Sequence, residues 1–71
     1  MNQTVELIVS RLPRKPILNA REVADALGLQ TTAAVVSAVE DGSLQAAKVG
    51  NQYRISRDAA AKWIREMEAA L

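Results

Sequence analysis

The sequence predicts a single domain that is mainly α-helical and carries a small β-hairpin. In residues 44–57, LQAAKVGNQYRISR, apolar and polar side chains alternate on both sides of a Gly-Asn turn, which is the pattern of a hairpin. Segments with the apolar spacing of a helix lie upstream, around Gly28, and downstream, around Trp63. A chain of 71 residues has room for little else.

The composition excludes several classes of protein. The chain has no cysteine, hence no disulfide, and no histidine, which removes the usual general base and the commonest metal ligand. Its carboxylates and lysines show no paired arrangement at catalytic spacing. No apolar run approaches the ~20 residues that span a bilayer, and the N-terminus lacks the features of a signal peptide. We expect a cytoplasmic protein that is not an enzyme and uses no cofactor or metal.

The charge is small overall but unevenly distributed. The net charge is +1, while residues 31–46 carry only Glu40 and Asp41. Two basic islands without any acid lie on either side, and this pattern favours a local contact with an anion. The first island, residues 11–21, contains Arg11, Arg14, Lys15 and Arg21, and the second, residues 47–57, contains Lys48, Arg54 and Arg57. Arg11, Arg14 and Lys15 belong either to a solvated linker or to an extended basic arm that reaches a phosphate group.

The N-terminal segment predicts a helix over residues 1–12. Asn2 or Thr4 is its expected cap, and Pro13 and Pro16 end it. Its apolar stripe either packs on the domain itself or forms a dimer seam, and consists of Val5, Ile8, Val9 and Leu12. The whole chain, 1–71, then divides into this helix, a core at 17–65 and a C-terminal helix extension at 66–71 that ends in Leu71.

Two further helices are predicted in the first half of the core. Asn19 and Glu22 have the spacing of a capping box, and Gly28 is expected to end the helix that they begin. The next helix should run from about Thr31 to Asp41, before Gly42. The side chains expected to face the core are Val23, Ala24 and Leu27 on the first of these helices, Val35, Ala38 and Val39 on the second, and Leu44 after it.

The hairpin register follows from its apolar residues. If Ala47, Val49, Tyr53 and Ile55 share the buried face, the loop has three residues, 50–52, and Val49 lies opposite Tyr53. Lys48 then lies opposite Arg54 on the outer face. Like charges in this arrangement reduce stability, so their retention favours a contact with phosphate.

The last helix should begin at a cap provided by Ser56. Its apolar stripe consists of Ala60, Trp63, Ile64 and Met67. Trp63 and Tyr53, the only aromatic residues, are predicted to be mostly buried, because a small core depends on such large side chains.

The segments NAREVADALGL, VEDGSL and AAKVGNQYRISRDAAAKWI occur here in an order that resembles the excisionase-like branch of the MerR-like winged helix-turn-helix proteins. The resemblance covers about residues 17–65, and Ala24 and Gly28 match the small residue that this family keeps four positions before the turn glycine. It implies a winged helix-turn-helix, to which the predicted helix over residues 1–12 is an N-terminal addition. It also implies a helix in the major groove, a wing on phosphate or the minor groove, and a role in recombination directionality or in transcriptional control of a phage or other mobile element.

The chain departs from that family in two respects. The stretch after Gly28 is one residue longer than expected, and the expected recognition helix, TTAAVVSAVED, contains no arginine or lysine. Readout of guanine by arginine is therefore not available from this helix. Specificity would depend on the wing, on DNA shape or on several copies side by side. The outward residues of the helix are Thr32, Ala33, Val36, Ser37 and Glu40.

We therefore predict sequence-selective binding of duplex DNA without catalysis. The residues expected in the major groove are Thr32, Ala33, Val36 and Ser37, and those expected on the backbone are Lys48, Arg54 and Arg57. Further partners under this hypothesis are an integrase or other regulator, a second copy in a homodimer or tandem copies on DNA, and no membrane. The alternative is a protein-interaction module on the same scaffold that binds a regulator or recombinase with little DNA contact.

Overall fold

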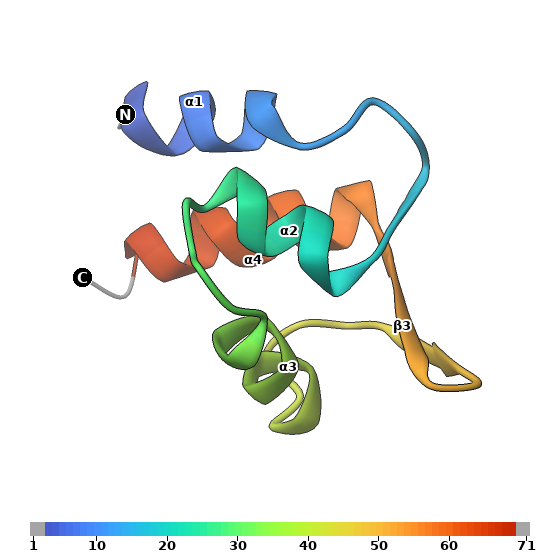
Figure 1. The fold of residues 1–71 in the computed structure, drawn as a ribbon. Helices are drawn as coiled ribbons and strands as arrows, with labels where there is room; N and C mark the ends of the chain where they lie inside the picture. Colours follow the sequence, from blue (N-terminus) through green and yellow to red (C-terminus); the bar gives the residue numbers. More distant parts are fainter. Residues whose placement is uncertain (1–2, 70–71) are drawn as a thin grey trace.

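Four helices and a three-stranded antiparallel sheet make up residues 3–69, which are the residues that the computed structural model describes (Figure 1). The predicted mainly helical domain with a hairpin is confirmed, and the short first strand is an addition that we did not predict. In chain order the elements are α1 (Gln3–Arg11), β1 (Ile17–Leu18), α2 (Ala20–Ala26), α3 (Ala33–Glu40), β2 (Ala47–Val49), β3 (Gln52–Ser56) and α4 (Arg57–Ala69).

Helices α1 and α3 lie at opposite ends of the molecule, with α2 and α4 between them (Figure 1). The strand order is β1-β3-β2, so β3 is the central strand. One apolar core joins the elements, and β2 is the only element in residues 3–69 that contributes no buried side chain to it. The largest fully buried side chains are Leu12, Leu18, Leu44, Ile55, Ile64, Val23 and Val35. No helix in this described part is long and apolar enough to cross a bilayer.

Helix α1 buries its predicted apolar stripe within the domain. Val5, Val9 and Leu12 are buried, and Ile8 packs against the core. The stripe is therefore not available as a dimer seam. Thr4 lies inside the helix, which begins at Gln3, and the other predicted cap, Asn2, lies outside the described residues, as does Leu71.

The ends of α2 and α3 follow local signals in the sequence. Asn19 and Glu22 form both hydrogen bonds of the predicted capping box. Gly28, with a φ of +76°, closes α2 in a Schellman motif, because the amide of Leu29 donates to the carbonyl of Ala24 (2.9 Å) and that of Gly28 to Asp25 (3.1 Å). Helix α3 begins at Ala33, two residues later than predicted, and no side chain of its N-cap residue caps it.

The hairpin register differs from the prediction. The loop has two residues, Gly50 and Asn51, where we predicted three. Gly50 has a φ of +63°, and no residue other than glycine has a positive φ in residues 3–69, so the turn has the glycine placement of type II′. The observed cross-strand pairs are Val49 with Gln52, Lys48 with Tyr53, and Ala47 with Arg54.

The position of β2 in the sheet explains this difference. The prediction assumed that apolar residues of both hairpin strands face the core. Strand β2 is instead an edge strand whose residues are all exposed, and Val49 has 59% of its surface accessible. A strand with no buried face does not specify its own register, so the turn sets it.

Helix α4 begins and packs as predicted. The Ser56 hydroxyl accepts a hydrogen bond from the amide of Ala59 (3.0 Å), which caps the helix. Trp63 and Ile64 are buried and Met67 packs against the core. Trp63 is buried, and Tyr53 is partly buried and packs against the core, so the prediction that both aromatic residues are mostly buried is confirmed.

Replacement of Trp63 by alanine should remove a large part of this core. Trp63→Ala is expected to lower the free energy of unfolding by about 3–5 kcal/mol. Because that range approaches the whole stability of so small a domain, the variant should be largely unfolded in circular dichroism. Lys62→Ala, at the neighbouring exposed position of α4, is the control. A Trp63→Ala variant that melts at the wild-type temperature would contradict the core role.

Stability should also depend on the ionisation of Glu22. Its carboxylate pairs with Lys15 Nζ (2.7 Å) and accepts from the amide of Asn19 (3.0 Å). The Lys15 ammonium, and after it the Asn19 amide, hold the pKa of Glu22 below its usual value of 4.5. A carboxyl whose pKa is lowered by folding stabilises the fold above its unfolded pKa, and this contribution is lost as the pH falls through the folded pKa.

Glu22→Gln keeps an acceptor for the Asn19 amide but removes the ion pair. The variant should therefore melt below the wild type near neutral pH, and the gap should close below about pH 4. Thermal midpoints measured across this pH range check the expectation. A gap of constant size in acid would mean that the Lys15 pair does not stabilise the fold.

Candidate nucleic-acid interface

A shallow groove runs between α2, α3 and the hairpin. The N-terminal end of α2 forms one side, α3 forms another, and the tip of β2–β3 forms the third. Figure 1 shows α3 and the hairpin at the same end of the molecule, away from α1. The lining residues are Asn19, Ala20, Arg21, Thr32, Val36, Asn51, Gln52 and Tyr53. Residues separated by up to 34 positions in the chain thus meet at one surface.

Helix α3 divides its predicted site residues between this groove and the solvent. Thr32 and Val36 are partly buried and line the groove, whereas Ala33 and Ser37 are exposed on the adjacent face together with Glu40. The four predicted major-groove residues therefore lie on one side of the helix. None of them carries a charge.

The two predicted basic residues of the hairpin do not lie on one face. Directly opposed residues of an antiparallel pair share a face, and successive residues alternate. Lys48 therefore shares the face of Tyr53, and its Nζ lies 5.6 Å from the centroid of that ring. Arg54 shares the other face with Ala47. The predicted pair of opposed charges is wrong, because it depended on the three-residue loop.

Lys48 therefore lies against Tyr53, which lines the groove, although Lys48 is not itself one of the lining residues. Arg54 lines a separate apolar depression on the other face, beside Ile17 and Ala47. The sequence argument missed Asn51 and Gln52 as site residues. Their amide side chains at the tip of a hairpin were the available signal, because such groups both donate and accept hydrogen bonds.

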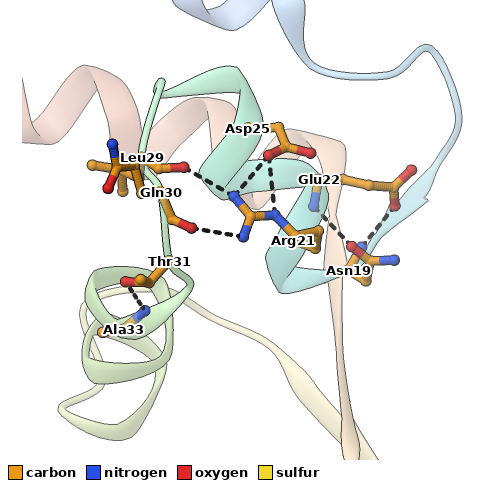
Figure 2. Close-up of polar contacts among 8 residues, drawn as sticks. All are labelled: Asn19, Arg21, Glu22, Asp25, Leu29, Gln30, Thr31 and Ala33. Atoms are coloured by element: carbon orange, nitrogen blue, oxygen red, sulfur yellow. Dashed lines mark hydrogen bonds and ion pairs between the residues drawn. The ribbon is translucent and has the colours of Figure 1, made fainter.

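Arg21 fastens the turn between α2 and α3 (Figure 2). Its Nε and Nη2 donate to Asp25 Oδ1 (3.0 and 2.7 Å), Nη2 also donates to the carbonyl of Leu29 (2.9 Å), and Nη1 donates to that of Gln30 (3.1 Å). Four of the five guanidinium N–H groups are thereby used. We refer to Arg21, Asp25 and these two carbonyls as the Arg21 clamp. It positions α3 relative to α2.

Arg57, the third predicted backbone contact, is tied into the fold. Its Nε donates to the carbonyl of Pro13 (3.2 Å) and its Nη2 to that of Val9 (3.2 Å). The guanidinium thus lies at the C-terminal end of α1, where a positive charge is favourable. These bonds account for Arg57 without DNA, and its contact with DNA stays a prediction.

The first basic island is also partly occupied. Lys15 pairs with Glu22 and Arg21 belongs to the clamp, whereas Arg11 and Arg14 are exposed and make no ion pair within residues 3–69. In the same described part, no three His, Cys, Asp or Glu side chains come together as a metal site.

The comparisons with known proteins add no relative: the chain matches no family model, no curated protein and no solved structure. The excisionase-like resemblance drawn from the sequence therefore stays a prediction.

Loss of the Arg21 clamp should loosen the turn ahead of α3. Arg21→Gln removes the charge and the forked donor, and should lower the free energy of unfolding by about 1 kcal/mol. Hydrogen exchange of the amides in residues 28–33 should become faster, while exchange in α4 changes less. Asp25→Asn, which leaves the bonds to Leu29 and Gln30, should have the smaller effect. Unchanged exchange in Arg21→Gln would show that the backbone alone holds the turn.

Proposed function

We propose that this chain binds duplex DNA as a winged helix-turn-helix protein, with α3 in the major groove and the β2–β3 hairpin as the wing. The observation that carries the proposal is the shared groove, which is lined by side chains of both α3 and the hairpin tip. A helix fits the major groove, which is about 12 Å wide. The hairpin beside it would then lie over the sugar-phosphate backbone.

The charges at this end of the molecule support binding to phosphate. Lys48 is exposed beside Tyr53, a residue that lines the groove, and Arg54 is exposed on the other face of the hairpin. Neither makes an ion pair in the described part of the chain. Phosphate contacts of this kind provide affinity and orientation without sequence information.

The biological role that we propose follows from the family resemblance. It is that of an excisionase-like recombination directionality factor or of a small transcriptional regulator of a mobile element. In either role the protein acts by occupying and shaping DNA, so it needs no catalytic group.

A second candidate function is docking to a regulator or recombinase. The favouring observation is that α3 carries no basic side chain and exposes Ala33, Ala34 and Ser37. A surface of small neutral groups is also suited to packing against another protein.

Binding to duplex DNA at two salt concentrations separates the two functions. We expect fluorescence anisotropy to detect binding of a random duplex at low salt, with an affinity that falls steeply as salt is added. Lys48→Gln should weaken binding about equally on all sequences and reduce the salt slope by roughly one. Arg54→Gln removes the same charge from the other face of the hairpin, so the smaller of the two effects identifies the face turned away from DNA.

Absence of binding to any duplex at low salt would reject the DNA proposal. The docking function would then be tested with Ser37→Glu, which places a charge at an exposed position of α3. This variant should lose binding to a recombinase encoded by a neighbouring gene.

A further inference from the structure

The exposed face of α3 offers an unusual chemistry for a surface that reads bases. Ala33 and Ser37 are exposed in its first two turns, Val36 is partly buried beside them, and Glu40 is exposed at its end. With Thr32 at the N-cap, the face therefore consists of methyl groups, two hydroxyls and one carboxylate. Its only side-chain hydrogen-bond donors are the hydroxyls of Ser37 and of the N-cap residue Thr32.

This chemistry disfavours guanine and leaves one major-groove feature as the main target. Guanine presents two acceptors, N7 and O6, whose specific partner is an arginine or lysine that donates to both, and α3 has neither. The carboxylate of Glu40 only accepts, so it repels those atoms and suits an exocyclic amino group. The methyl groups of Ala33 and Val36 suit the 5-methyl group of a pyrimidine, which is the apolar group on the floor of the major groove.

The basic side chains near α3 do not replace the missing donors. Arg21 lies across the groove, but four of its five N–H groups are used in the Arg21 clamp. Lys48 lies over the ring of Tyr53 on the hairpin. The face that would meet base edges is therefore apolar, while the donors belong to the turn and to the wing.

We infer that α3 recognises pyrimidine 5-methyl groups in the major groove; this inference rests on the proposed function. Two bases carry the group, thymine and 5-methylcytosine. The second also presents an amino group that could donate to Glu40. Burial of the methyl group between Ala33 and Val36, which are neighbours at i and i+3 on the helix, supplies the selectivity, because it removes apolar surface from water.

Matched duplexes test the inference with the whole chain. A preferred site is enriched from a random duplex pool at low salt, and it is then prepared with thymine, or with uracil, which lacks only the methyl group. Affinity should fall about fourfold for each contacted methyl group removed, with the salt slope unchanged. Two further duplexes carry a cytosine–guanine pair or a 5-methylcytosine–guanine pair at the same positions. A gain with 5-methylcytosine over cytosine identifies the methylated base as a second source.

A pair of variants assigns the effect to α3. Ala33→Gly should move the affinity ratio of thymine to uracil sites toward one. Ala34→Gly has the same backbone change, but Ala34 lies about half a turn from Thr32 and Val36, so the ratio should be kept. Thermal melting checks that both variants fold.

Each outcome has a distinct meaning. DNA binding with equal affinity for thymine and uracil sites overturns the methyl inference and leaves the proposed function standing. If Ala33→Gly and Ala34→Gly both keep the thymine preference of the wild type, the inference is also overturned, because the methyl groups would then be read by another part of the protein. No binding to any duplex rejects the proposed function, and the inference with it.

Discussion

Strand β3 holds the domain together because it has neighbours on every side. It pairs with β1 along one edge and β2 along the other, and its Ile55 is fully buried. The strand runs directly into α4, and the amide of Arg57 donates to the carbonyl of Pro16 (2.9 Å) just before β1. One strand therefore determines where the hairpin projects, where the connector after α1 lies and where the last helix begins.

Three arginines connect segments of the chain that the core alone does not join. Arg21 bonds to the carbonyls of the α2–α3 turn, and Arg57 bonds to those at the end of α1. Arg65 pairs through two hydrogen bonds of 3.0 Å with Glu6, which links α4 to α1 and lowers the pKa of that glutamate. In a core with so few large side chains, forked donors of this kind bond to backbone carbonyls in the segments that follow α1 and α2, and so hold those segments in place.

These internal contacts reduce the number of charges that the two basic islands can offer to a partner. Lys15, Arg21 and Arg57 have partners within the fold, so fewer charges face outward than the sequence implies. The proposed DNA surface therefore combines a few phosphate contacts on the hairpin with a neutral helix. Such a surface favours apolar recognition of bases over hydrogen-bonded readout.

The sequence by itself determined the features that depend on near neighbours. The capping box of Asn19 and Glu22, the cap at Ser56 and the helix ends at Gly28 and Gly42 all involve atoms within a few residues of one another. The apolar stripes of the helices were also correct, since burial follows the helical period. The expected site residues of α3 do lie on one side of that helix, for the same reason.

Only the tertiary structure decided the features that depend on distant residues. The bonds of Arg57 span 44 and 48 positions, and nothing near Arg57 in the sequence indicates them. Strand β1 is too short to show a pattern, and it exists because Ile17 and Leu18 pair with β3. The predicted hairpin register was wrong for a related reason. The apolar alternation of β2 predicts a buried face, but β2 is an edge strand beyond the core and has none. The two-residue turn therefore set the register and placed Lys48 and Arg54 on opposite faces.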